Sequence, residues 1–175
     1  MKKMKRLAAV LLVGIMALAM LTACGGTPST PGTPVTRDEA LEKSVAEWTV
    51  ELGKGAKLNL TEDAALTAIS EKCLPSKVKE YDAAIANDRQ AFEDAVTEMY
   101  EIFDEARNGK KVAVVEMKFL KNEEVTKESL TAKVQKDRDG ILSILHAAGV
   151  ELPAKFGVTV TKQKDYTLIL FMVSE

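Results

Sequence analysis

Residues 166–173 read YTLILFMV, and this stretch decides the fold. Apolar side chains stand at nearly every position, whereas a strand with one face in water alternates apolar and polar residues. The pattern therefore predicts a strand that is covered on both faces. Residues 163–165 form a link short enough for a hairpin with the segment before them. We expect residues 166–173 to be the central strand of a sheet with helices on each side.

Two further segments supply the other expected strands. Residues 112–120 (VAVVEMKFL) place Glu116 and Lys118 on one face, opposite a fully apolar face. Residues 156–162 (FGVTVTK) alternate large apolar side chains with glycine and threonine, so that one of their faces is polar. We expect about three strands, paired mainly in the antiparallel sense.

The remaining folded segments show the periodicity of helices. The expected helices span residues 36–52, 62–73, 76–107 and 126–148. A capping box at residues 36–39 (TRDE) is expected to begin the first helix, and Pro75 to follow the end of the second. Polar residues around Asp88 leave a break in the third as an alternative, and Thr126 can cap the fourth. The sequence predicts an α+β fold with about four helices and a small sheet, covered by helices on both faces.

The N-terminal residues carry a targeting pattern. Four basic residues lie within positions 2–6, an apolar run covers 7–20, and Leu21-Thr22-Ala23-Cys24 follows. This layout resembles the signal peptide of bacterial lipoproteins, whose lipobox ends in cysteine. The resemblance implies cleavage before Cys24 and attachment of a diacylglyceryl group to its sulfur. The apolar run is shorter than the roughly 20 residues that cross a bilayer, which favours this interpretation over an uncleaved anchor.

The segment after Cys24 is expected to be a spacer. Residues 25–36 read GGTPSTPGTPVT, and such a composition cannot bury enough apolar surface to fold. If extended at about 3 Å per residue, it separates the domain from a bilayer by roughly 35 Å. We expect a signal peptide at 1–23, the lipidated cysteine and spacer at 24–36, and one globular domain at 37–175.

The charge balance argues against two classes of partner. The whole chain has a formal net charge of −2, and removal of residues 1–23, which hold four basic and no acidic groups, leaves −6. A nucleic-acid footprint needs a basic patch, and a polybasic attraction to anionic lipids needs the same. We therefore expect no nucleic-acid partner, and membrane attachment through the lipid alone.

A row of acids is the first candidate for a binding surface. Asp94, Glu98, Glu101 and Glu105 recur at helical spacing and share one face of the expected third helix. They could hold calcium or a basic partner, but calcium prefers six or more oxygens from a folded loop, and the sequence contains no such loop. A solvated helix face is the simpler interpretation, and we expect no metal or cofactor.

Two single residues are weaker candidates. His146 is the only histidine, and no partner for a catalytic or metal site can be nominated from the sequence. Once Cys24 is lipidated, Cys73 is the one cysteine left, and its apolar helical surroundings predict a buried, inert thiol. An intermolecular disulfide is the alternative, because an odd cysteine in an exported protein can pair with another chain.

The folded region also resembles, in layout, the CAP superfamily of cysteine-rich secretory proteins. The resemblance rests on residues 157–173 (GVTVTKQKDYTLILFMV) and 60–70 (LTEDAALTAIS), and it spans about 37–173. It implies an α-β-α sandwich closed by a hairpin that begins with glycine. The His/Glu cleft residues of that family do not appear here, because His146 matches none of its motif positions.

These observations lead to three expected functions. The first is a lipid-anchored, non-catalytic binding or interaction domain that faces outside the cytoplasm and takes an envelope or extracellular ligand. The second is an envelope hydrolase that uses Glu116 with an acid from the third helix. The third is a degenerate CAP-like module that binds lipid or peptide.

Overall fold

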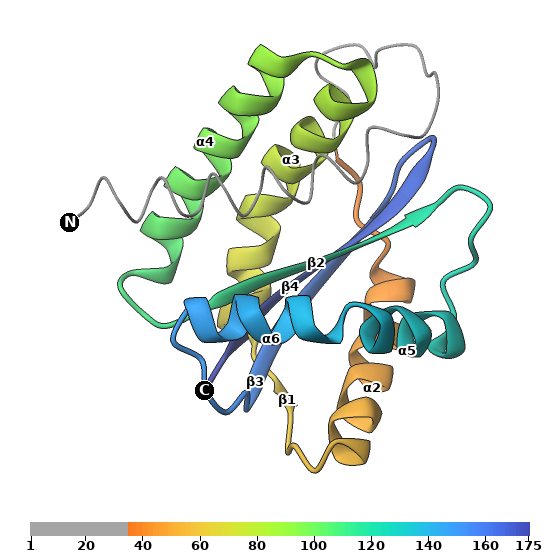
Figure 1. Cartoon of the computed structure of the whole chain (residues 1–175), viewed down its shortest axis with the longest axis vertical. Coiled ribbons are helices and arrows are strands. Elements are labelled where there is room, and N and C mark those ends of the chain that lie inside the picture. Colours follow the sequence, from red (N-terminus) through yellow and green to blue (C-terminus); the bar gives the residue numbers. More distant parts are fainter. Residues whose placement is uncertain (1–34) are drawn as a thin grey trace.

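A computed structural model describes residues 35–175; the expected signal peptide, Cys24 and nearly all of the spacer lie outside this range. Within it the chain forms five helices and four strands, which confirms the α+β class (Figure 1). The helices are α2 (Glu39–Gly55), α3 (Ala64–Ala86), α4 (Arg89–Arg107), α5 (Lys127–Lys136) and α6 (Arg138–Ala147). The strands are β1 (Thr61–Glu62), β2 (Ala113–Leu120), β3 (Lys155–Lys162) and β4 (Tyr166–Ser174).

The sheet has the order β1-β3-β4-β2. Strand β4 lies between β3 and β2 and pairs with both in the antiparallel sense, as residues 166–173 predicted. The two-residue strand β1 is parallel to β3 and makes the sheet mixed. It was not expected, because Glu62 belongs to the predicted helix 62–73; Asp63 caps α3 instead, with its side chain accepting from the amides of Ala65 and Leu66.

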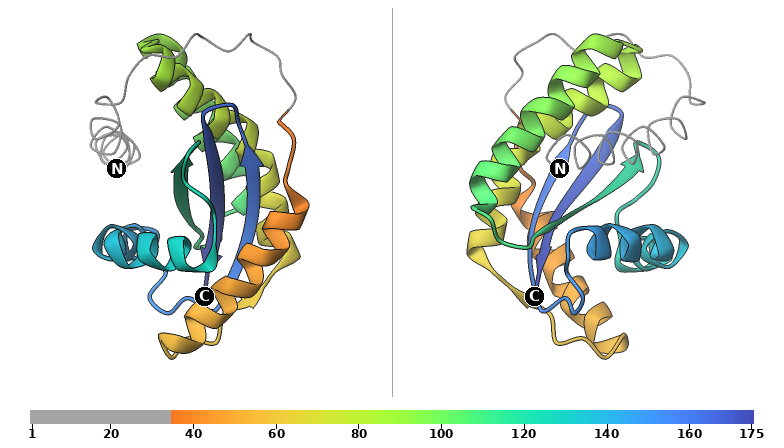
Figure 2. Two further views of the ribbon diagram at one scale, coloured as in Figure 1. Left: turned by 90° about the vertical axis from the view of Figure 1, so that its right-hand side faces the viewer. Right: turned by 60° about the vertical axis from the view of Figure 1, so that its left-hand side comes forward.

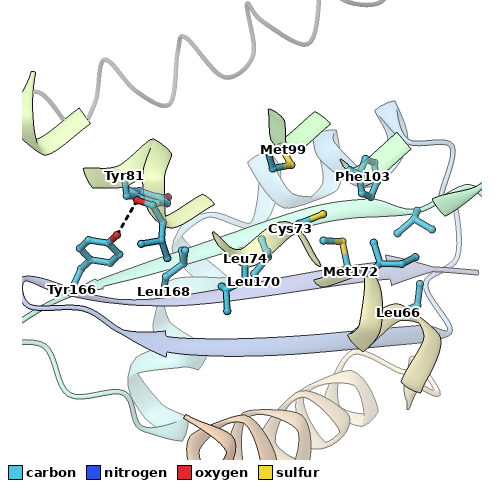
Figure 3. Close-up of a cluster of buried hydrophobic side chains, with 13 residues drawn as sticks. Leu66, Cys73, Leu74, Tyr81, Met99, Phe103, Tyr166, Leu168, Leu170 and Met172 are labelled. Atoms are coloured by element: carbon cyan, nitrogen blue, oxygen red, sulfur yellow. Dashed lines mark hydrogen bonds between the residues drawn. The ribbon is translucent and has the colours of Figure 1, made fainter. Parts of the chain in front are cut away.

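Helices cover both faces of the sheet, which confirms the predicted layering. Leu168, Leu170 and Met172 of β4 pack against α3 and α4, as Figure 3 shows. Ile169 and Phe171 point the other way, into a second cluster built with α2 and α5. The right-hand view of Figure 2 separates α3 and α4 from α5 and α6 across the sheet. The continuous apolar run of β4 follows from this double burial.

Helix α3 is longer than predicted, because it continues through Pro75. A proline inside a helix removes one backbone hydrogen bond and costs about 3 kcal/mol or more. Leu74 before it and Val78 after it are buried in the cluster against β4, and this packing offsets the cost. The helix ends instead at Asn87, which has a left-handed conformation, and Asp88 caps α4. The expected helix 76–107 therefore breaks at the polar residues around Asp88.

Two other helix boundaries differ from the prediction. Asp38, rather than a capping box at residues 36–39, caps α2 by accepting from the amide of Leu41. The expected helix 126–148 divides at Asp137 into α5 and α6, just before Asp139 and Gly140, two residues of low helix propensity. Thr126 caps α5 as predicted.

The polar face of β3 is buried, and it receives the first turns of α3. Thr159 is fully buried, and its hydroxyl lies 2.7 Å from that of Ser70, which also donates to the carbonyl of Leu170 at 2.9 Å. A Cβ atom built on Gly157 would lie 2.0 Å from the backbone nitrogen of Thr67. The small residues of β3 thus let a helix backbone approach the sheet directly, and this contact fixes the position of α3.

Candidate functional site

The most unusual group of side chains is a buried ionic cluster between α3 and the edge strand β2. The Nζ of Lys77 lies 2.9 Å from Oε2 of Glu80 and 2.6 Å from Oε2 of Glu116. The side chains of Lys77 and Glu80 are only 5% and 8% exposed, and that of Glu116 is 18% exposed. Charged side chains are seldom this deeply buried unless they are paired. We call these three residues the Lys77 cluster.

The alternation of β2 and the period of α3 bring these residues together. Glu116 pairs in register with Leu170, so it shares the sheet face that packs against α3. Lys77 follows Cys73 by one helical turn and precedes Tyr81 by another, and both of these residues are buried. Lys77 therefore occupies a core position of the helix, and Glu116 is the neighbour across the interface.

The surroundings of the Lys77 cluster shift the pKa values of its groups and of the neighbouring Tyr81. Burial lowers the pKa of Lys77, but the nearby carboxylates Glu116 and Glu80 together raise it more, so the ammonium form is favoured. Burial and the charge of Glu116 raise the pKa of Glu80 above its usual value, although Lys77 opposes this shift. Burial and the same two carboxylates also raise the pKa of Tyr81.

Tyr81 connects the Lys77 cluster to the wider core. Its ring lies 5.5 Å, centroid to centroid, from that of Tyr166, and the Nζ of Lys118 lies 4.9 Å from its centroid. The hydroxyl of Tyr166 donates to Oδ1 of Asp82 at 3.0 Å. Figure 3 shows the rings of Tyr81 and Tyr166 side by side, near the hairpin between β3 and β4.

The hydrolase hypothesis required two acids at a common cleft. Glu116 does meet an acid of the predicted third helix, Glu80, but Lys77 lies between them and pairs with both. Two open surface hollows in residues 35–175 lie elsewhere. One, of about 390 Å³, is lined by residues 36–39 and Lys162, and another, of about 370 Å³, lies at the start of α3. Neither hollow borders Glu116.

The predicted acidic row lies on the outer side of α4. Asp94 accepts a hydrogen bond from Nε2 of Gln90 at 2.9 Å, and Glu98 pairs with Lys79 at 2.8 Å. Glu101 and Glu105 are exposed. Within residues 35–175, no three His, Cys, Asp or Glu side chains are arranged to hold a metal ion. The described arrangement of these acids is that of a solvated helix face.

The two single candidates differ in burial. His146 is exposed near the end of α6. Cys73 is a free, fully buried thiol, and burial raises its pKa to about 11. Because the thiolate is the reactive form, this environment favours the inert thiol over the disulfide alternative.

Arg37 fixes the start of the described chain to the domain. Its Nε donates to Oε1 of Glu42 at 2.9 Å, and its Nη1 pairs with Glu71. The buried carboxylate of Glu42 also accepts from the amide of Val160 at 2.9 Å. Arg37 itself forms an antiparallel bridge with Thr161. The chain therefore joins the fold at the end of β3 near the hairpin.

No family model, curated protein or solved structure matches this chain. The resemblance of the folded region to the CAP superfamily stays a prediction, because a layer order alone does not define a family. None of the helices in the described part of the chain is long and apolar enough to cross a membrane.

The raised pKa of Glu80 predicts a pH-dependent effect of the substitution Glu80→Gln. A carboxyl group whose pKa is higher in the folded state stabilises the fold fully below its unfolded value of 4.5, and this contribution is lost as the pH rises through the folded value. Glutamine imitates the protonated form. We expect the stability of the variant to increase relative to the parent chain as the pH rises above about 4.5, the ordinary pKa of a glutamate carboxyl group.

Urea unfolding at several pH values measures this difference. The matched control is Glu98→Gln, which removes an exposed carboxylate that pairs with Lys79. If Glu80→Gln instead became less stable relative to the parent chain as the pH rises, the fold would be stabilised by Glu80 in its carboxylate form.

Proposed function

We propose that this protein is a lipid-anchored lipoprotein that faces outside the cytoplasm and displays a non-catalytic binding domain. The single observation that carries the proposal is the order of basic residues, short apolar run and lipobox that ends at Cys24. Two acyl chains on one cysteine suffice for stable attachment, whereas one chain binds only marginally. The Thr/Pro-rich spacer then holds the domain away from the bilayer.

The geometry of the domain supports this proposal in two ways. A tethered domain needs a firm junction with its tether, and the pairing of Arg37 with Glu42 and Glu71 supplies one. The most deeply buried charged groups, Lys77 and Glu80, pair with one another inside the fold. The exposed groups remain for contacts with a ligand.

The substitution Cys24→Ser tests the anchor. Without the sulfur, no diacylglyceryl group can be attached, so we expect the chain to disappear from the membrane pellet of its host or to stay as the uncut precursor. Mass spectrometry of the parent protein should find an N-terminal lipidated Cys24. Cys73→Ala is the matched control, because it removes the other cysteine and leaves the lipobox intact. An unmodified, full-length parent chain in the cytosolic fraction would exclude the proposal.

Binding can be separated from hydrolysis with isolated envelope material. The native lipoprotein, reconstituted in vesicles, is incubated with cell wall or membrane fractions, and both retention and released products are measured. We expect retention without products. Released fragments that disappear in the Glu116→Gln variant would favour the carboxylate-dependent hydrolase, and retention of no wall fragment, protein or small ligand would contradict a binding domain.

A further inference from the structure

The Lys77 cluster brings an amine and a carboxyl group together in a site that largely excludes water. The Nζ of Lys77 lies 2.6 Å from Oε2 of Glu116. That oxygen is buried, so water does not compete with the Lys77 amine for contact with the Glu116 carboxyl group. A second carboxyl group, that of Glu80, lies 2.9 Å from the same nitrogen.

We propose that Lys77 and Glu116 become joined by an amide bond between Nζ and Cδ, with Glu80 as the general acid–base group. The product would be a covalent link between helix α3 and the edge strand β2. This modification site goes beyond the proposed function and does not depend on the lipid anchor.

The reaction is a condensation that needs no oxidant, reductant or further reactant. The Lys77 ammonium first gives a proton to Glu116, which leaves a neutral amine beside a carboxylic acid. The lone pair of Nζ attacks Cδ of Glu116, and the C–N bond forms. Glu80 removes the second proton from the nitrogen and supplies a proton to the departing hydroxyl, so the C–O bond breaks and one water leaves. The ion pair is thereby replaced by a neutral amide.

Burial and proximity favour a condensation that does not occur between free groups in water. Intramolecular groups held in reactive geometry reach effective concentrations of about 10⁵–10⁸ M. The buried ion pair also carries a desolvation cost, which a neutral amide relieves. The pKa of Glu80 is raised by burial, so this residue can hold the proton that the leaving hydroxyl needs. Because the ammonium form of Lys77 is favoured, we expect the reaction to be slow.

The chain contains a matched pair that should not react. The Nζ of Lys79 lies 2.8 Å from a carboxylate oxygen of Glu98, but these side chains are 60% and 44% exposed. Water surrounds this pair, and within residues 35–175 the Lys79 nitrogen forms an ion pair with no second carboxyl group. The difference between the two pairs isolates burial and the second acid as the causes of reaction.

Peptide mass spectrometry of the processed chain, purified from its own host and digested with trypsin, tests the proposal. We expect one cross-linked species that contains Lys77 and Glu116, is lighter than its two component peptides by one water, and is uncut after Lys77. Peptides with Lys79 and Glu98 should be unlinked in the same digest. Only unlinked Lys77 and Glu116 peptides from folded protein would overturn the proposal, and so would an equal link between Lys79 and Glu98.

Two variants test the roles of the residues. Lys77→Arg keeps a positive charge but lacks the reactive amine, so the cross-link should be absent. Glu80→Gln keeps both reacting groups and removes the acid–base group, which should slow formation of the link by about 10²–10⁴-fold in the freshly folded chain. Cross-linking of Glu80→Gln at the rate of the parent chain would exclude the role of Glu80. The digest of the parent chain decides the existence of the bond even if a variant does not fold.

Discussion

Gly157→Ala is expected to destabilise the domain by about 3 kcal/mol or more, because overpacking against a backbone cannot be relieved by a change of rotamer. The added methyl carbon would lie 2.0 Å from the nitrogen of Thr67 and 2.3 Å from the carbonyl carbon of Leu66. Both atoms belong to the first turn of α3. The helix must therefore move away from β3, and the contact between Ser70 and Thr159 would be lost with it.

Urea unfolding of the purified chain measures this effect. Gly140→Ala is the matched control, since Gly140 lies inside α6 and a Cβ there would meet nothing within 4 Å. Alanine replaces glycine in a helix with a gain of roughly 0.5–1 kcal/mol, so the two variants should move in opposite directions. Equal stability of Gly157→Ala and the parent chain would mean that α3 does not approach β3 as closely as described.

The strands and layers could be predicted because each depends on a local pattern. Residues 166–173 are apolar on both faces, and a strand of this kind needs cover on both sides. The structure agrees, with α3 and α4 on one face and α2 and α5 on the other. The alternation of β2 was also read correctly, with Glu116 and Lys118 on one face.

The helix boundaries depended on long-range packing and were predicted less well. Pro75 is a strong local signal for the end of a helix, but tertiary contacts of its neighbours outweigh its cost. Strand β1 consists of two residues whose pairing with β3 is visible only after the chain has folded. Local propensity is a weak guide wherever a segment is fixed by partners far away in sequence.

The Lys77 cluster was missed for a similar reason. Glu116 was named as a candidate acid, but its partners Lys77 and Glu80 were not. One signal was available: Lys77 is three or four residues from Cys73, Leu74 and Tyr81, so it shares their core-facing stripe. A lysine on an apolar stripe predicts a buried acidic partner, since an unpaired buried charge is very unfavourable.

Lys77→Met is expected to cost about 3–5 kcal/mol, because it leaves the carboxyl groups of Glu80 and Glu116 buried without their common cation. Loss of that cation removes a cause that lowers the pKa of Glu80, so its folded pKa rises further above the unfolded value. The destabilisation should therefore be greatest near neutral pH and should decrease as the pH falls and Glu80 becomes protonated.

The exposed substitution Lys79→Met is the control, and removal of its pair with Glu98 should cost only about 0.2–1 kcal/mol.

A triple variant, Lys77→Met with Glu80→Leu and Glu116→Val, distinguishes an ion cluster from an amide. Apolar replacement of a whole buried ion cluster is often neutral or stabilising. If the parent chain holds the cluster as ion pairs, the triple variant should therefore be about as stable as the parent chain. If Lys77 is joined to Glu116 by an amide, the parent chain also has the stability of a covalent cross-link between α3 and β2, and apolar packing cannot restore that contribution. A triple variant that unfolds at a lower urea concentration than the parent chain, together with a cross-linked peptide in the digest, indicates the amide. A triple variant as stable as the parent chain, with no cross-linked peptide, indicates an ion cluster.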